Sequence, residues 1–329
     1  MPPQMRADVR FVCFILAFAL AGAPAARAYT AYVSNEKSNT VTVIDTEKFE
    51  PVRTIKVGQR PRGIDITKDG KFVLVAVGDD DTIQMIDTTT GEIAGTLPSG
   101  PDPEFFAQDP AGKFLYVSNE NDNTVTIIDI AKRTQTGAVE VGVEPEGIGI
   151  SPDGKILVNT SETTNMAHLI EIETRRIVAN VLVDARPRFA AFKSDGSELW
   201  VSSEVGGTVS VIDPAKHAVT AKIAFAVAGL RNEAIQPVGI NITNDGKTAF
   251  VALGPANRIA VVDAVTHQVE RYLLVGQRVW HMAFTPDEKY LLATNGLTND
   301  VSVIDVPARK VIKTIQVGEL PWGVVVGNR

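Results

Sequence analysis

Apolar and polar residues alternate in short stretches along almost the whole chain. Residues 40–45 are Thr-Val-Thr-Val-Ile-Asp, and residues 124–129 are Thr-Val-Thr-Ile-Ile-Asp. Alternation with a period of two predicts strands that bury one face, and no stretch shows the spacing of an amphipathic helix. Turn residues separate the stretches, among them the Asp-Gly pair at 69–70, which is typical of a tight hairpin. The pattern therefore predicts an all-β chain.

These stretches form a long repeat that is marked by a proline. The interval is 42 residues, except for one of 50, and a valine replaces the proline once: Pro61, Pro103, Pro145, Pro187, Pro237, Val279 and Pro321. Each repeat holds four apolar runs of strand length, for example 147–151, 156–160, 167–172 and 177–183. Seven repeats of four antiparallel strands predict a seven-bladed β-propeller.

The two ends of the chain support a closed ring. Residues 29–35 correspond to the second strand of a repeat, and residues 322–327 correspond to the first strand. We therefore expect the C-terminal strand to join the N-terminal blade, which leaves no large open sheet edge.

A carboxylate ends the third strand of every repeat. These residues are Asp45, Asp87, Asp129, Glu171, Asp213, Asp263 and Asp305. A row of acids is compatible with metal binding, but the position before a hairpin favours a structural role. We expect each aspartate to cap the turn into the fourth strand.

The N-terminus has the pattern of a secretory signal peptide. Arg6 and Arg10 precede an apolar run over residues 11–21, and Ala26-Arg27-Ala28 follows. We expect cleavage after Ala28, a mature propeller of residues 29–329 and a periplasmic location; an uncleaved anchor is the alternative. The single cysteine, Cys13, lies within the apolar run.

The formal charge of −7 becomes −9 once the predicted signal peptide, with three arginines and one aspartate, is removed. An acidic chain lacks the basic excess that nucleic-acid binding requires, so we expect no nucleic-acid partner. With the signal peptide removed, we also expect no membrane association.

Several segments carry a family resemblance. Tyr-Val-Ser-Asn at 32–35 and 116–119 resembles the YVTN-type propeller repeat, and residues 158–168, 184–189 and 274–280 are similar to the PQQ-dependent catabolism-associated β-propeller proteins. The resemblance implies a periplasmic propeller that works beside PQQ-dependent alcohol oxidation, and it supplies no catalytic residues. The quinoprotein dehydrogenases themselves have eight blades and a tryptophan-rich motif, whereas this chain has seven repeats and three tryptophans.

The residues beside the repeated proline differ from copy to copy. In a propeller the loop before each first strand opens on one mouth of the central channel, so this mouth is the candidate site. We call this loop the proline loop. Its candidate binding residues are Arg60, Arg62, Asp102, Glu104, Glu144, Glu146, Arg186, Arg188, Arg278, Trp280, His281 and Trp322.

A second mouth loop, between the second and third strands, adds glutamates at one equivalent position: Glu36, Glu120, Glu162 and Glu204. Five arginines and eight carboxylates give the mouth a formal charge of −3. That sign favours a basic protein partner, such as a periplasmic c-type cytochrome, or a cation. Inter-blade ion pairs are the structural alternative.

Trp280 and Trp322 beside the arginines also suggest a platform for a flat anion such as PQQ. Calcium is compatible with the many oxygen ligands, although neither cofactor has a specific motif. The alternative to an anion platform is a structural role, in which the two tryptophans pack across the channel.

Three functions follow from these features. The first is a periplasmic binding protein that docks a PQQ-dependent dehydrogenase or a cytochrome. In this function the chain itself is not an enzyme. The second is a carrier or sensor of PQQ or another small anion. The third is a lactonase-like hydrolase, in which His281 acts near Arg278 and a glutamate.

Overall fold

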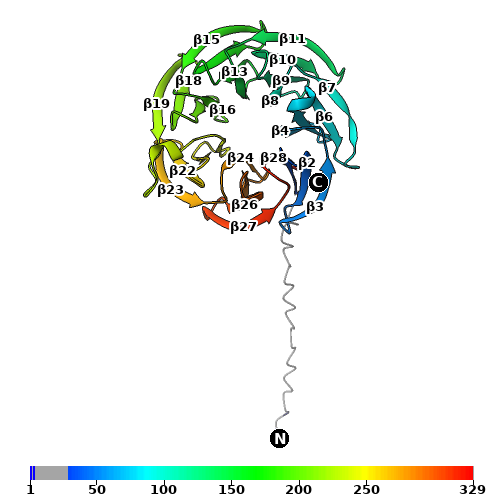
Figure 1. Ribbon diagram of the computed structural model, residues 1–329. Helices are drawn as coiled ribbons and strands as arrows, with labels where there is room; N and C mark the ends of the chain where they lie inside the picture. The colour runs from blue at the N-terminus through cyan, green and yellow to red at the C-terminus, as the bar shows by residue number, and fades with distance from the viewer. Residues whose placement is uncertain (2, 4–28, 329) are drawn as a thin grey trace.

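The computed structural model describes residues 1, 3 and 29–328, and its strands form a ring of seven four-stranded antiparallel sheets (Figure 1). This confirms the predicted seven-bladed β-propeller. Almost all of the predicted signal peptide, residues 2 and 4–28, lies outside the described residues, so its cleavage stays a prediction. Among the described residues, no helix has the length and apolarity needed to cross a membrane.

We number the blades from the one that contains both ends of the chain. Blade 1 is β28 (Pro321–Asn328), β1 (Tyr29–Asn35), β2 (Thr40–Asp45) and β3 (Glu50–Lys56). Blade 2 is β4 (Pro61–Ile66), β5 (Phe72–Val77), β6 (Thr82–Asp87) and β7 (Ile93–Pro98). Blade 3 is β8 (Pro103–Gln108), β9 (Phe114–Asn119), β10 (Thr124–Asp129) and β11 (Thr134–Glu140). Blade 4 is β12 (Pro145–Ile150), β13 (Ile156–Ser161), β14 (Met166–Glu171) and β15 (Arg176–Leu182).

The remaining blades continue the order around the ring. Blade 5 is β16 (Pro187–Phe192), β17 (Leu199–Ser203), β18 (Thr208–Asp213) and β19 (Ala218–Ala224). Blade 6 is β20 (Ile240–Ile242), β21 (Thr248–Ala252), β22 (Arg258–Asp263) and β23 (Gln268–Leu274). Blade 7 is β24 (Val279–Phe284), β25 (Tyr290–Asn295), β26 (Asp300–Asp305) and β27 (Lys310–Gln316). Two short 3-10 helices, η1 (Gly78–Asp80) and η2 (Asn232–Ala234), lie in loops of blades 2 and 6.

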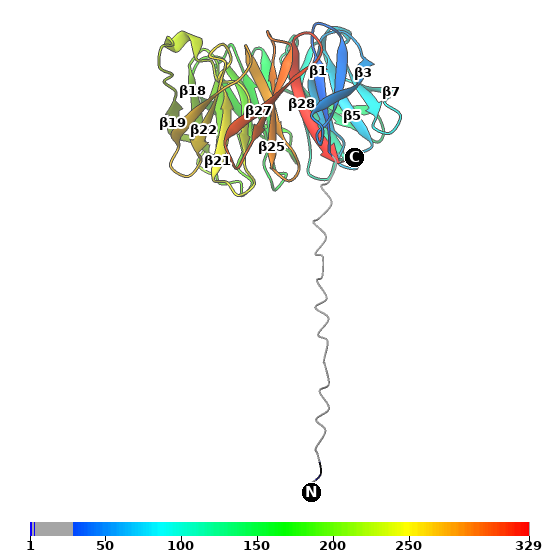
Figure 2. The same cartoon turned by 90° about the horizontal axis from the view of Figure 1, so that it is seen from below.

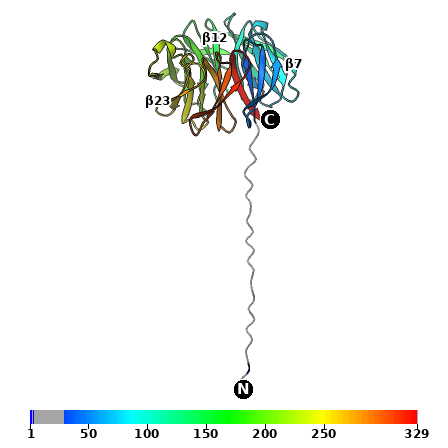
Figure 3. The same ribbon diagram turned by 60° about the horizontal axis from the view of Figure 1, so that its bottom comes forward.

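The C-terminal strand closes the ring as the sequence predicts. β28 pairs antiparallel with β1, for example Tyr32 opposite Val325, so the two ends of the chain share one sheet. Figure 2 shows the ring from the side, with the C-terminal end of β28 at the lower face and the loop that carries η2 at the upper face. The tilted view in Figure 3 shows the strands running between these two faces. Closure places blade 1 between blades 7 and 2, so both faces of its sheet pack against a neighbouring blade.

The apolar core lies between neighbouring blades. The second and third strands are buried almost throughout, whereas the outer fourth strand exposes most of its residues, as in β3. Each apolar cluster joins two adjacent blades; one cluster packs Tyr32 and Val41 of blade 1 against Ile64 and Val73 of blade 2. The ring therefore derives its stability from repeated sheet-to-sheet contacts.

The lower-face turns follow the sequence prediction. Gly70, Gly112, Gly154, Gly196 and Gly246 have φ between 65° and 73°, the left-handed region that a tight turn requires. The aspartates that end the third strands cap the next turn; Asp87 Oδ1 accepts the N–H groups of Thr89 and Thr90 at 2.9 and 2.8 Å. Their role in the fold is therefore structural.

Candidate functional site

In six of the seven proline loops, the residue before the proline, or before Val279 that replaces it, has left-handed backbone geometry. Arg60, Asp102, Glu144, Arg186, Arg278 and Leu320 have φ between 55° and 59°. This conformation is unfavourable for residues other than glycine, so the surrounding structure must hold it.

A side chain 21 residues upstream supplies that restraint. The N–H groups of these six residues donate to side-chain oxygens at 2.9–3.2 Å, and the acceptors are Asn39, Asp81, Asn123, Asn165, Asn257 and Asn299. These residues were not predicted as part of the site. Their recurrence just before the third strand of six repeats is the signal that finds them.

A register shift then turns the residue after the proline toward the channel. The pairing between the first and second strands is interrupted directly after the proline, for example between Pro61 and Ile64 and between Pro103 and Phe106. Such a bulge re-aims a side chain without unfolding the rest of the strand. Side chains from several blades therefore meet at one mouth.

These side chains enclose a cavity of about 300 Å³. All of its lining residues belong to the predicted site: Glu36, Arg60, Arg62, Asp102, Glu120, Glu146, Arg186, Arg188, Glu204, Arg278, Trp280 and Trp322. We call it the mouth cavity. Four other predicted residues, Glu104, Glu144, Glu162 and His281, do not line it.

One side of the mouth cavity is built around the fully buried Glu104. Its carboxylate contacts Arg62 Nη1 at 2.6 Å and Arg60 Nη1 at 3.1 Å, and Arg60 also pairs with Asp102. Burial opposes ionisation of Glu104, but Arg62 and Arg60 outweigh it and lower the pKa of this carboxyl. Glu104 is therefore ionised at neutral pH.

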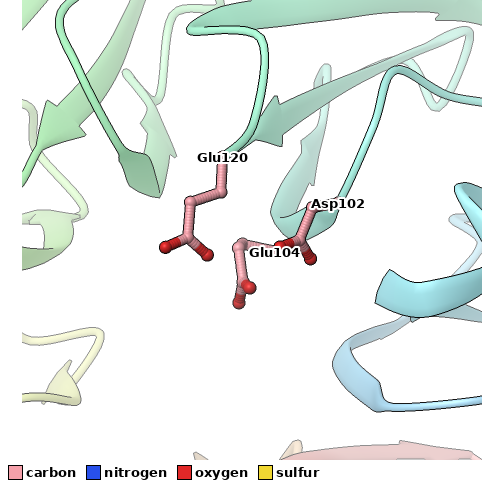
Figure 4. Close-up of side chains that lie close together, drawn as sticks. All are labelled: Asp102, Glu104 and Glu120. Atoms are coloured by element: carbon pink, nitrogen blue, oxygen red, sulfur yellow. The ribbon is translucent and has the colours of Figure 1, made fainter.

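Glu120 lies beside this ionised carboxylate, and the side chains of Asp102, Glu104 and Glu120 lie close together (Figure 4). Burial, followed by the hydrogen bond and the negative charge of Glu104, raises the pKa of Glu120 to about 7. Glu120 is thus a cavity-lining acid that changes protonation near neutral pH.

The same three residues are the candidate metal ligands, because one oxygen of each lies within 4.8 Å of the others. Arg60 and Arg62 already contact Asp102 and Glu104. Two guanidinium groups therefore neutralise the charge that a bound calcium ion needs, so this cluster fits a cation poorly.

Three arginines occupy the other side. Arg188 is buried and contacts Glu146 at 2.9 Å and also Glu162. Arg186 Nε lies 2.7 Å from Glu162 and 3.3 Å from Glu204, and Arg278 Nη2 lies 3.2 Å from the same Glu204. Ion pairing between blades, the structural alternative, describes most of these contacts, whereas Arg186 and Glu204 pair within blade 5.

Glu144 does not line the cavity, and it accepts a hydrogen bond from Thr163 in the second mouth loop. Burial raises the pKa of Glu146, and the nearby Glu104 and Glu162 add to this effect while Arg188 opposes it. The formal charge of −3 therefore overstates the negative charge of the mouth at neutral pH.

Aromatic rings close the channel below the mouth cavity. The centroid of the His281 ring lies 4.3 Å from that of Trp322, 4.7 Å from that of Phe105 and 5.6 Å from that of Phe189. Trp322 is buried, with Arg62 over its ring at 5.7 Å, so it packs across the channel as the structural interpretation holds. Phe105 and Phe189, which complete this cluster, were not predicted, because nothing in their sequence spacing distinguishes them from ordinary strand residues.

His281 is neutral in this environment. Burial, with Arg188 and Arg62 nearby, lowers its pKa well below the usual value, and no described residue hydrogen-bonds to either ring nitrogen. No hydrogen bond or ion pair joins its ring to Arg278 or a glutamate among the described residues. The hypothesis that assigns His281 a hydrolytic role therefore lacks the geometry that such a role requires.

The sequence of this chain matches a known family of β-propeller proteins. The family described as "Lactonase, 7-bladed beta-propeller" matches residues 25–105 and 179–319. No curated protein matches the chain. The resemblance to the PQQ-associated propeller proteins is not tested by these findings and stays a prediction.

Solved propellers of low identity cover nearly the whole chain. A putative 6-phosphogluconolactonase from Bacteroides fragilis has 20% identity and a TM-score of 0.77, covering 93% of this chain and 99% of its own. Kuenenia stuttgartiensis hydrazine synthase has 19% identity and a TM-score of 0.72, covering 82% and 95%. Identities this low establish similarity of fold alone.

Proposed function

The chain belongs to the lactonase family of seven-bladed β-propellers, and on this premise we propose that it hydrolyses a small polar lactone in the mouth cavity. The observation that carries the proposal is the position of Glu120. Its carboxyl lines the cavity, hydrogen-bonds to the ionised Glu104 and lies among guanidinium groups. A proton-accepting group beside fixed positive charge is what acyl hydrolysis needs.

The size and polarity of the cavity support a small substrate. A volume of about 300 Å³ lies at the lower end of small-molecule sites. Ten of its lining residues are charged and the other two are tryptophans. A compact, hydroxylated ring fits this lining better than a long acyl chain.

Glu120 handles the proton in the proposed reaction. Ionised Glu120 accepts a proton from water, and the hydroxide adds to the lactone carbonyl carbon. Cavity arginines donate hydrogen bonds to the oxyanion that forms. The ring C–O bond then breaks, the departing oxygen takes the proton from Glu120, and the product is the open hydroxy acid.

A hydrolysis assay with the variant Glu120→Gln tests this role. We expect purified chain to open at least one member of a panel of sugar-derived γ- and δ-lactones, followed by acid release. Glu120→Gln should lower kcat by about 10² to 10⁴ with little change in KM. Glu92→Gln, on an exposed lower-face hairpin, is the matched control. Absence of hydrolysis across the panel, or equal kcat in Glu120→Gln, would reject the proposal.

Docking of a redox partner in the periplasm is the second candidate. The observation that favours it is a pair of exposed apolar side chains on second mouth loops, Val205 at 65% and Leu297 at 61% exposure. Exposed apolar residues beside charged loops are typical of protein interfaces. Calorimetric titration with a basic c-type cytochrome or a PQQ-dependent dehydrogenase tests it, and binding unchanged by Leu297→Ser would count against this face.

A further inference from the structure

A second cavity opens on the lower face of the ring. It has a volume of about 690 Å³, and its walls are the ends of β28 and β1, two turns of blade 2 and Pro286 of blade 7. We call it the lower cavity. None of its described lining residues belongs to the mouth cavity, so a ligand bound here would be independent of the proposed hydrolysis.

The lower cavity exists because blade 1 has no hairpin between its first and second strands. β28 and β1 come from opposite ends of the chain, so they pair in one sheet without a connecting turn. From blade 2 to blade 7, neighbouring hairpins touch one another; a Cβ at Gly112 of blade 3 would lie 2.8 Å from Lys68 of blade 2. Gly70 holds the position of Gly112 in blade 2, and a Cβ there would meet no described atom within 4 Å. The place of the absent hairpin is therefore open.

Asp65 of β4 brings a carboxyl group to this cavity from a strand position that is otherwise uncharged. The residues at the same position, four after the proline or after Val279, are Ala107, Gly149, Ala191, Asn241, Ala283 and Val325. Three blades thus carry alanine where blade 2 carries Asp65. The strand itself does not require an acid here.

The partners of Asp65 are neutral. Its Oδ2 accepts a hydrogen bond from Gln108 Nε2 at 2.7 Å, and its Oδ1 accepts the N–H of Ile66 at 2.8 Å. Burial raises the pKa of Asp65, and the hydrogen bond from Gln108 and the charge of Lys68 only partly oppose it. No lysine or arginine among the described residues forms an ion pair with Asp65, whereas the buried Glu104 and Glu146 of the mouth each contact an arginine.

The other charged groups of the lower cavity do not supply this missing counter-ion. Asp69 is already engaged by Thr67 Oγ1 at 2.7 Å and by Lys71 Nζ at 3.1 Å. The rest of the lining is hydroxyl groups and apolar side chains, and the apolar ones are Tyr32, Ile66, Pro286, Val325 and Val326. Asp65 is therefore a carboxylate beside an apolar wall that is open to a ligand.

This combination suits an organic cation better than a metal ion. Calcium takes about six to eight oxygen ligands, which one carboxylate and a few hydroxyl groups do not provide. A primary ammonium group carries three N–H donors, which match the carboxylate and neighbouring hydroxyl oxygens. The carbon atoms attached to it would cover apolar surface, which is favourable in water.

We propose that the lower cavity binds a primary ammonium group, which pairs with Asp65 while the carbon chain or ring that carries it lies on the apolar wall. The group belongs to a small amine or to a lysine side chain of a partner protein, and both offer the same charge-assisted hydrogen bonds. The site gives the propeller a second binding function on the face opposite the mouth cavity.

Binding is measured by calorimetric titration of 2-phenylethylamine into the purified chain at pH 7 and low salt. The neutral control is 2-phenylethanol, which has the same carbon skeleton with a hydroxyl group in place of the ammonium group. We expect the amine to bind about tenfold or more tightly than the alcohol, because only the amine forms a charge-assisted hydrogen bond with Asp65.

Two substitutions of Asp65 test the residue itself. Asp65→Asn keeps the shape, and Asp65→Ala introduces the residue that blades 3, 5 and 7 carry at this position. Each should weaken amine binding by about tenfold or more. Glu92→Gln, which removes an exposed carboxylate from the same face, should leave the affinity unchanged. Lys68→Gln should tighten binding, because it removes a positive charge that lines the cavity and repels the ligand.

A second probe, N-acetyl-lysine amide, separates the two sources of the ammonium group. Tighter binding of the lysine derivative identifies a lysine side chain of a partner, and tighter binding of 2-phenylethylamine identifies a small amine. The proposal is overturned if neither amine binds, or if 2-phenylethanol binds as tightly as 2-phenylethylamine. Wild-type affinity in both Asp65→Asn and Asp65→Ala would also overturn it, because the amine would then bind elsewhere on the chain.

Discussion

Replacing Glu104 with glutamine tests the electrostatic basis of the site, because it removes one buried charge and keeps the shape. Glu104 hydrogen-bonds to Glu120 and places a negative charge beside it. The amide introduced by Glu104→Gln would carry no charge, so no negative charge at residue 104 would disfavour the ionisation of Glu120. We therefore expect the pKa of Glu120 to fall in this variant.

The magnitude follows from the contributions to the pKa of Glu120. The value of about 7 lies well above the 4.5 of an unperturbed glutamate, and burial is the largest cause, ahead of Glu104. Removing the charge of Glu104 therefore reverses only part of the increase in the pKa of Glu120. A decrease of roughly one pH unit, or about 1.4 kcal/mol, is expected in this variant.

The direct assay is a titration of the side-chain carboxyls by 13C nuclear magnetic resonance, with Glu120 assigned from the Glu120→Gln spectrum. If Glu120 is the base, the pH at half-maximal kcat/KM should shift to lower pH by the same amount. Glu92→Gln is the control for changes in total charge. An unchanged or raised pKa in Glu104→Gln would refute the assignment of Glu104 as the neighbour that perturbs Glu120.

The same substitution has a predictable effect on folding. Arg60 and Arg62 would lose the partner that balances them in a site where Glu104 is fully buried. Removing one member of a buried ion pair costs about 3–5 kcal/mol, and the amide oxygen recovers part of this by accepting one hydrogen bond. We expect a loss of about 2 kcal/mol in the free energy of unfolding, measured by urea denaturation.

Three further predictions concern the scaffold. Asn257→Ala should lower stability by about 1 kcal/mol, because the N–H of Arg278 loses its acceptor; equal urea midpoints would contradict the restraint. His281 is neutral in the folded state, so wild-type stability should fall by up to about 1.4 kcal/mol per unit as the pH decreases below 6.5, the ordinary histidine pKa, and His281→Phe should show a smaller fall. Ending the chain at Leu320 removes β28 and should abolish cooperative unfolding, and a cooperative transition in circular dichroism would show that closure is dispensable.

The fold could be predicted from the sequence because its signals are local and repeated. The spacing from Pro61 to Pro321 gives the blade count, and the aspartates that end third strands give the hairpins. The position of the mouth followed from comparing the copies at the proline. Nine of the twelve cavity residues flank the proline or Val279, and the other three, Glu36, Glu120 and Glu204, come from the second mouth loop.

The pairing within the cavity could not be predicted in the same way. Glu204 binds arginines from its own blade and from blade 7, so its partners depend on distances across the channel. The pKa of Glu120 depends on burial and on Glu104, both of which a count of charges ignores. His281 was grouped with polar residues by its type, whereas the structure surrounds it with aromatic rings.

The separation of scaffold and site explains how one ring can carry a charged cavity without losing stability. The apolar clusters lie between sheets, where the strands are regularly paired, and the cavity residues lie at the register shifts before that pairing begins. Substituting a charged residue beside the proline therefore changes the cavity and its ion pairs, whereas the apolar clusters between the sheets lie elsewhere. Residues such as Asn257 connect the two, because they hold the loop in a conformation that its own residues disfavour. The chemistry of the mouth is thus set by a few side chains, and their positions are restrained by Asp81 and the five upstream asparagines.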